Sequence, residues 1–385
     1  MRSTIRSRLH PELNWRLAIP MSTLTTVAAI AVAPGQPDSL QRTTVALPPP
    51  GPDDVLVDTI RVGICGTDRE IIRGDLGRAP QGSDLLVIGH EVLGRVRSVG
   101  AAVTDLAPGD LVSAMVRRPD GCPACQAGEP DMCLWGTYTE RGIEGLHGFL
   151  MEQFVERRDY LVPVPASLEA TGVLIEPLTI VEKAVRQAHL IQRRLAHWRP
   201  ATAIITGAGP IGILGALLLR SMGLDVYSVA RTPPPNAASR LLSAAGAHYV
   251  SSREEPLPAL ARRLGHVDLI IESSGAGPVV FEAMQALGTN GVLVLLSLTG
   301  ANETFPVPGD AINLSLVAGN KVVVGSVNAG RIDFVNAVER LARFEELWPG
   351  LAAAMITTRL PFDAPLEAIS RKATDGIKTV VELAP

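Results

Sequence analysis

The segment that most constrains the fold is a glycine-rich loop between a predicted strand and a predicted helix. Residues 203–206 are apolar and β-branched, the loop 207–212 reads G-A-G-P-I-G, and an apolar helical run continues to Met222. Glycines at this spacing permit a tight turn, a close approach to a pyrophosphate and close packing of helix on strand. A glycine-rich turn in the core is the alternative. We therefore expect a dinucleotide to contact Gly207, Gly209, Pro210, Ile211 and Gly212 at the helix N-terminus.

After this loop the chain alternates between short β-rich runs and helical runs. Strands are expected, with helices between them, at 226–230, 248–251, 268–272, 291–298 and 321–327. Such a β-α-β series predicts a doubly wound parallel sheet. A long helix is expected before the loop, from Leu174 to about Ala196, and the chain should end in a helix and a strand, at 332–344 and 379–383.

The first third of the chain has the pattern of a small β-barrel. Residues 27–33 and 54–62 are apolar or alternating and are joined by a proline-rich stretch at 47–52. Glycine and proline then recur every eight to twelve residues over 63–133. Short strands at that spacing are typical of an all-β, barrel-like unit. The sequence thus predicts a β unit beside an α/β unit.

Composition and charge exclude several classes of partner. The 385 residues carry 35 basic and 39 acidic side chains, a net charge of −4, so we expect no nucleic-acid surface and no polybasic membrane patch. Proline and glycine interrupt the uncharged stretches at 17–37 and 201–219, which predicts no membrane span. The arginine-containing first twenty residues could be a transit-like tail, but a dispensable extension is the simpler interpretation, and a cytoplasmic protein is expected.

The end of the second strand of the parallel sheet indicates which dinucleotide binds. An acidic residue about 20 positions after the first glycine would hold the ribose hydroxyls of NAD. This chain reads S-V-A-R-T over 228–232, and Asp225 precedes the expected strand. The guanidinium of Arg231 suits a 2′-phosphate, so NADP is the expected cofactor, with NAD as a second acceptor. The alternative is that Arg231 is an ordinary solvated side chain.

Three residues far apart in sequence form a candidate zinc site. Cys65, His90 and Glu176 offer a thiolate, an imidazole and a carboxylate, a set that suits a catalytic zinc ion with one open position. A buried inert cysteine and a structural histidine are the alternatives. Three further cysteines crowd into 122–133, which indicates metal binding more readily than disulfides.

Several motifs, in order along the chain, resemble those of the zinc-dependent medium-chain dehydrogenase superfamily. They are G-I-C-G-T-D at 63–68, G-H-E at 89–91 with Gly94, the cysteine cluster and the G-A-G-P-I-G loop. Four more resemble the glucose 1-dehydrogenase branch in particular: R-R-P at 117–119, T-E-R-G-I at 139–143, G-L-H-G-F at 145–149 and G-S-V-N at 325–328. The resemblance covers nearly everything from about residue 24 onward.

This resemblance implies a fold and domain boundaries. The expected architecture is α/β plus β: a GroES-like, partly open β-barrel catalytic domain with an inserted, doubly wound Rossmann domain. The N-terminal extension would span 1–23, the catalytic domain 24–187 and 329–385, and the NADP-binding domain 188–328. Dimers and tetramers are common in the superfamily, so one of these assemblies is expected.

The resemblance also assigns roles to individual residues. Cys65, His90 and Glu176 match the catalytic zinc ligands, and Glu91 is an alternating fourth ligand. Thr67 matches the hydroxyl that begins a proton relay. The substrate contacts that the resemblance implies are Thr67, Glu140, Glu176 and Asn328. The further cofactor contacts are Ser297, Ser326, Val327, Asn328 and Lys378.

Two departures from the family pattern leave questions open. The structural zinc lobe of the family has four cysteines, and Cys122, Cys125 and Cys133 match the last three, whereas the first position is occupied by Pro119. Asp120 or another group would have to complete a second, structural zinc site. In addition, the sugar enzymes carry a polar residue four positions after the zinc carboxylate, where this chain has Ile180.

The expected function is that of a zinc-dependent oxidoreductase of carbohydrate metabolism. It would transfer a hydride from the C1 hydroxyl of a glucose-like aldose to NADP and release the lactone. Ile180 favours the alternative of another polyol or secondary alcohol dehydrogenase of the superfamily. A non-catalytic cofactor-binding relative is the alternative from a different class, and the presence of Cys65, His90 and Glu176 together argues against it.

Overall fold

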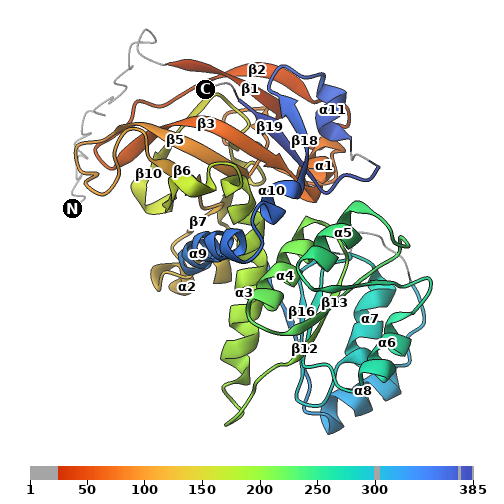
Figure 1. Ribbon diagram of the computed structural model, residues 1–385. Helices are drawn as coiled ribbons and strands as arrows, with labels where there is room; N and C mark the ends of the chain where they lie inside the picture. The colour runs from red at the N-terminus through yellow and green to blue at the C-terminus, as the bar shows by residue number, and fades with distance from the viewer. Residues whose placement is uncertain (1–24, 299–303, 372–373, 384–385) are drawn as a thin grey trace, which may run out of the picture.

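The computed structural model describes residues 25–298, 304–371 and 374–383. Figure 1 shows a unit built mainly of strands above a second unit in which helices flank a parallel sheet. The predicted extension at 1–23 lies outside the described residues. No helix within the described ranges combines the length and apolar character that a membrane span requires. The uncharged stretch 201–219 forms a strand and a helix of the second unit.

The first unit contains a seven-stranded, mostly antiparallel sheet with the order β11-β6-β5-β3-β19-β18, in which β10 also pairs with β3. Its C-terminal strand β19 lies between β3 and β18, so both ends of the chain build one sheet. The strands are β3 (Asp54–Ile64), β5 (Glu91–Val99), β6 (Leu111–Ala114), β10 (Gln153–Arg157), β11 (Leu161–Val164), β18 (Ile356–Pro361) and β19 (Lys378–Glu382).

Two small sheets complete this unit. One has the order β2-β1-β4 and the other β7-β8-β9. The sequence analysis missed β2, which forms an antiparallel hairpin with β1, because its side chains are largely exposed and carry no buried apolar face. The strands are β1 (Thr26–Val32), β2 (Gln41–Ala46), β4 (Leu86–Val87), β7 (Arg117–Arg118), β8 (Thr139–Arg141) and β9 (Gly145–Leu146).

The second unit is a six-stranded parallel sheet with the order β14-β13-β12-β15-β16-β17. This confirms the predicted doubly wound sheet, because the order reverses at β12 and helices cover the faces. Two predicted strands were too long: β16 and β17 end at Leu295 and Gly325, and the residues beyond form loops. The strands are β12 (Thr202–Thr206), β13 (Asp225–Ala230), β14 (His248–Ser251), β15 (Leu269–Glu272), β16 (Val292–Leu295) and β17 (Val322–Gly325).

Short helices connect these strands. In the first unit they are α1 (Gly66–Ile72), α2 (Pro123–Gln126), α11 (Leu366–Ser370) and the 3-10 turns η2 (Pro130–Met132), η3 (Arg158–Tyr160), η4 (Ala166–Leu168) and η5 (Gly172–Leu174). In the second unit they are α4 (Pro210–Ser221), α5 (Ala237–Ala244), α6 (Leu257–Leu264), α7 (Gly277–Ala286) and α8 (Gly309–Ala318).

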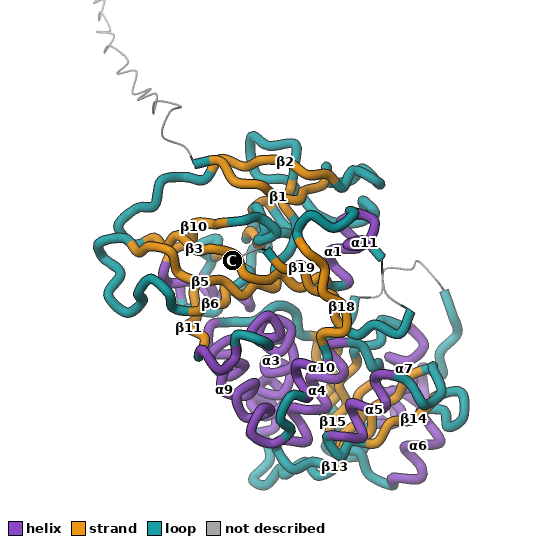
Figure 2. The backbone as a smooth tube through the Cα atoms, turned by 45° about the horizontal axis from the view of Figure 1, so that its top comes forward, coloured by secondary structure: helices purple, strands orange, loops and turns teal. Residues whose placement is uncertain are grey.

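Two long helices join the units. The helix α3 (Ile175–Gln192) packs against α9 (Arg331–Leu347), which continues into α10 (Leu351–Ala354). Figures 1 and 2 show α3 running from the first unit along the second, with α9 beside it. Buried residues of α3 share one apolar cluster with Leu93 of the first unit and Ile205 of the second. Because 187 lies inside α3, the predicted boundary at 187/188 cuts a helix that packs against both units; the boundaries remain predictions.

Candidate functional site

The predicted cofactor residues lie beyond the carboxyl ends of neighbouring parallel strands. The glycine loop follows β12, Arg231 follows β13, Ser297 follows β16, and the segment 326–328 follows β17. Carboxyl ends of parallel strands meet at one edge of a sheet, and the crevice at the reversal of strand order is where such folds bind ligands. The structure therefore brings these residues to one edge of the sheet.

The glycine loop packs closely at Gly207 and Gly212 and leaves its backbone open at Gly209. Gly207 has φ of +96°, which favours glycine, and its N–H donates to Val229 O at 2.8 Å. A side chain at Gly212 would collide with the carbonyl oxygen of Gly207, so helix and strand pack closely there. No atom lies within 4 Å of a Cβ built at Gly209, and α4 begins at Pro210. The helix N-terminus is thus accessible to an anion.

Arg231 is exposed directly after β13 and makes no hydrogen bond or ion pair with any residue that the structure describes. Asp225 is the first residue of β13 rather than a residue before the strand, as the sequence analysis had placed it. It lies at the other end of the strand, where His248 Nε2 is 3.0 Å from its Oδ1. No carboxylate of β13 thus stands beside Arg231.

The first part of the candidate metal cluster is Cys65 with His90. The Sγ atom of Cys65, at the N-cap of α1, lies 3.2 Å from His90 Nε2. Asp68, which the sequence analysis did not include among site residues, is fully buried and accepts N–H bonds from Cys65 at 2.8 Å and Gly89 at 3.0 Å. It therefore fixes the backbone at Cys65 and at the residue before His90. Its place three residues after the N-cap is a signal that the sequence offered.

The second part consists of His90, Glu91 and Glu176. One nitrogen or oxygen atom of each lies within 4.8 Å of the others, and His90 belongs to both parts. Glu91 is buried and forms an ion pair with Lys378, which is only 1% exposed. A side chain at Gly63 would occupy the space of this pair. Lys378 thus has an internal carboxylate partner, and its predicted cofactor contact remains a prediction.

Burial shifts the pKa values of these groups. It raises the pKa of Glu176 to about 7, and it raises the pKa of the Cys65 thiol together with the charge of Asp68. Burial would lower the pKa of His90, but Cys65 and Asp68 raise it well above its usual value. Among the described residues, His90 Nδ1 is buried without a hydrogen-bond partner, and the nearest carboxylate oxygen, Asp68 Oδ1, is 3.6 Å away. Buried sulfur, nitrogen and oxygen donors in this state fit a zinc ion.

We predict that the metal-free protein loses stability as the pH rises from about 4.5 to about 7. The folded state holds the Glu176 proton up to about pH 7, whereas the unfolded state releases it near pH 4.5, so the folded state binds the extra proton within this window. In Glu176→Gln, the slope of unfolding free energy against pH should differ by up to about 1.4 kcal/mol per pH unit. Urea unfolding with a chelator measures both slopes, and identical slopes would contradict the assignment.

The three cysteines of the second cluster surround Asp120. The Oδ1 atom of Asp120 lies 3.4 Å from Cys125 Sγ, and its Oδ2 atom lies 3.0 Å from Cys133 Sγ. All four residues offer ligand atoms within 4.8 Å of one another, and none of the cysteines is in a disulfide. Desolvation would raise the pKa of Cys122, but N–H bonds from Leu134 and Cys125 lower it overall. The cluster is consistent with a structural zinc site.

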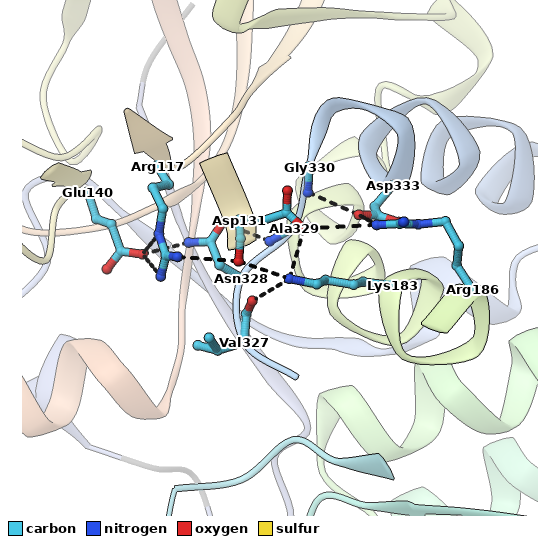
Figure 3. Close-up of polar contacts among 10 residues, drawn as sticks. All are labelled: Arg117, Asp131, Glu140, Lys183, Arg186, Val327, Asn328, Ala329, Gly330 and Asp333. Atoms are coloured by element: carbon cyan, nitrogen blue, oxygen red, sulfur yellow. Dashed lines mark hydrogen bonds and ion pairs between the residues drawn. The ribbon is translucent and has the colours of Figure 1, made fainter. Parts of the chain in front are cut away.

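The predicted substrate residue Glu140 lies in a buried polar group. Its Oε1 accepts from Arg117 Nε at 2.9 Å and from Asn328 Nδ2 at 2.6 Å. Its Oε2 makes no hydrogen bond to another described residue, and Figure 3 shows this oxygen turned away from Arg117. Thr67 is half-buried in α1, two residues after Cys65. An unused carboxylate oxygen of this kind can accept a hydroxyl of a ligand.

Two family descriptions together match most of the chain. Residues 51–166 match the alcohol dehydrogenase GroES-like domain, and residues 169–383 match the glucose dehydrogenase C-terminus. The first range covers much of the β unit, which confirms the predicted GroES-like character, and the second covers the whole parallel sheet, α9 and β19.

Curated relatives are similar over nearly their full length. A glucose 1-dehydrogenase of Methanocella arvoryzae is 42% identical over 357 residues, which is 92% of this chain and 99% of that protein. Glucose 1-dehydrogenase 1 of Caldivirga maquilingensis is 41% identical over 363 residues, with 93% and 99% coverage.

A solved structure is also similar. It is described as Haloferax mediterranei glucose dehydrogenase in complex with NADP, Zn and gluconolactone, and it matches with a TM-score of 0.84 and 33% identity. The match covers 93% of this chain and 99% of that one.

Proposed function

The chain belongs to the zinc-dependent medium-chain dehydrogenase superfamily, in its glucose dehydrogenase branch, and from this we propose that it oxidises glucose at C1 with NADP, giving gluconolactone. The observation that carries the proposal is one juxtaposition. His90 belongs to two groups of candidate ligands, one with half-buried Cys65 and the other with buried Glu176, and Glu140 bonds to Asn328 at the cofactor edge of the sheet. A zinc-assisted hydride transfer needs a metal site, a substrate hydroxyl and a nicotinamide brought together in this way.

Cys65, His90 and Glu176 would hold a catalytic zinc ion, with Glu91 as the alternating fourth ligand. Such an ion acts as a Lewis acid and lowers the pKa of the substrate hydroxyl. The protein's part is to exclude water from the cluster, to orient the ligands through Asp68, and to begin a proton relay at Thr67, whose hydroxyl accepts a hydrogen bond from the substrate hydroxyl and passes its own proton on toward solvent.

NADP is the proposed hydride acceptor. The open backbone at Gly209 and the helix dipole of α4 suit its pyrophosphate, and the guanidinium of Arg231, which has no partner among the described residues, suits its 2′-phosphate. The loops after β16 and β17 supply the predicted contacts of Ser297 and the segment 326–328, with NAD as a second acceptor.

Glu140 and Asn328 are proposed to select the sugar. Glu140 Oε2 accepts a hydrogen bond from a ring hydroxyl. A substrate that lacks this hydroxyl would leave the carboxylate without a donor, which disfavours binding of that substrate. Ile180, on α3, supplies no hydrogen bond and favours the second candidate, another polyol or secondary alcohol. The test is a panel of aldoses, polyols and secondary alcohols read by NADPH and NADH absorbance. Turnover of secondary alcohols without turnover of any aldose would overturn the sugar assignment.

A second, structural zinc is proposed in the cysteine lobe, with Asp120 as its fourth ligand. Asp120→Ala or Cys125→Ser should lower the metal content from two to one per chain and lower Tm by roughly 5–10 °C, because ligand loss removes folding energy. The kcat per folded molecule should fall by less than about tenfold, since structural zinc takes no part in the chemistry. Metal analysis that finds one zinc in the wild type, with Tm unchanged in both variants, would mean that the lobe holds no zinc.

The proposed assembly is a homodimer or homotetramer in the cytoplasm, as is common in the superfamily. Light scattering at several concentrations measures the assembly, and a monomer at all of them would contradict the proposal.

A further inference from the structure

We propose that Lys183 is a positioning residue that, together with Asp131, holds the loop after β17 in place against the substrate site. The inference rests on the proposed function only in so far as this loop, residues 326–330, contacts the nicotinamide and the substrate. The contacts that carry it are drawn in Figure 3.

The ammonium group of Lys183 has three protein partners and almost no exposure to water. It lies 2.8 Å from Asp131 Oδ2 and donates to the carbonyl oxygens of Asp131 at 3.2 Å and Val327 at 2.9 Å. Lys183 is 1% exposed and Asp131 is 6% exposed. An ammonium carries three donors, so this site uses all of them. One of the three N–H donors bonds to the backbone carbonyl of Val327, a loop residue that is 56% exposed.

The same loop is fixed at two further positions by different elements. Asn328 has φ of +59°, a conformation uncommon for a residue other than glycine, and its side chain bonds both Glu140 and the N–H of Ala329. The N–H of Gly330 donates to Asp333 at 3.0 Å. Arg186 of α3 in turn pairs with Asp333 at 2.7 Å. Side chains thus determine a conformation that the backbone would rarely adopt alone.

The geometry of α3 explains why this arrangement concerns the active site. Glu176 and Lys183 lie seven positions apart on α3, about two turns, and so point to nearly the same face. One rigid helix therefore carries a proposed zinc ligand at its first turn and the contact to the cofactor loop about 10 Å further on. Replacing a buried ion pair by apolar residues is often neutral for stability. Stability alone therefore does not account for a buried lysine aimed at a loop carbonyl.

The test compares three variants of the full-length protein. Lys183→Met removes the ammonium and leaves Asp131 with only its longer contact to Arg186, at 3.9 Å, so stability should fall. Lys183→Met/Asp131→Leu removes both charges and separates the positioning role from stability. Glu182→Gln is the matched control: Glu182 is the neighbouring residue of α3, is 5% exposed, and pairs with Arg340 away from the loop. The measurements are Tm, zinc content, NADPH affinity by fluorescence titration, and kcat and KM for both substrates.

We expect both Lys183 variants to bind NADPH about 10- to 100-fold more weakly and to show raised KM values, because one backbone anchor of the loop is lost. Zinc content should stay at the wild-type value. The double variant should recover Tm but not affinity, and Glu182→Gln should match the wild type in affinity. Recovery of both Tm and affinity in the double variant, or unchanged affinity in both variants, would overturn the proposal. Because NADPH titration needs no sugar, it distinguishes this failure from a wrong substrate assignment.

Discussion

His90→Ala should reduce kcat by about a thousandfold or more while the chain remains folded. The imidazole belongs to both parts of the buried cluster, so its loss leaves neither part able to hold a catalytic zinc ion. Lewis-acid stabilisation is worth several kcal/mol in the transition state, and each 1.4 kcal/mol corresponds to a factor of about ten in rate. Cys65→Ala should behave in the same way, because its Sγ is the neighbouring ligand atom.

Steady-state kinetics with NADP, zinc analysis and circular dichroism measure this result together. His248→Ala is the matched control, because this histidine is exposed and pairs with Asp225 at the far end of β13. It should retain wild-type turnover and zinc. Near-full activity and zinc content in His90→Ala would mean that the metal is held elsewhere.

Arg231→Ala should lower kcat/KM for NADP by about 5- to 100-fold, the scale of one charge-assisted hydrogen bond to a phosphate. The side chain is exposed after β13 and has no partner among the described residues, so it is available for a 2′-phosphate. NAD has no group at that position, and its kcat/KM should change by less than twofold. Arg231→Lys keeps the charge but not the bidentate geometry and should give an intermediate loss with NADP.

Parallel titrations with NADP and NAD separate the two explanations for Arg231. Equal losses with both cofactors would make the arginine structural. A wild-type preference for NAD would refute the argument from the second strand as a whole.

The sequence predicted the parallel sheet well because its signals are local. A β-branched run, three glycines at fixed spacing and a helical run lie within 20 residues of one another, and β12 and α4 form there. The strand β2 was missed because its residues face water and show no apolar alternation. Strands β16 and β17 were predicted too long because apolar side chains continue into the loops at the sheet edge. These loop residues have no neighbouring strand to pair with, so they form no further strand.

The candidate ligands were found from their local motifs, whereas the residues that hold them in place were not. Asp68 and Lys183 are charged, and composition gives no indication that a charged side chain is buried. Lys183 follows Glu182 and precedes Ala184 in α3, so its immediate neighbours gave no clear signal of burial. Only the folded chain shows that Asp131, 52 positions earlier, supplies its counter-charge.

The position of β19 between β3 and β18 has a consequence for the order in which the protein can be made. Arg61 and Glu382 pair across this junction although 321 positions separate them. During translation, every strand of the parallel sheet is therefore synthesised before β19, the strand that completes the first sheet. The nucleotide-binding unit can close while the chain is still growing, because units generally fold as they emerge. During that time β10 can pair with residues 54–58 of β3, but residues 61–64 lack their partner, and such an open edge is a template for intermolecular association. The first sheet is therefore most open to intermolecular pairing in the interval before β19 has been synthesised.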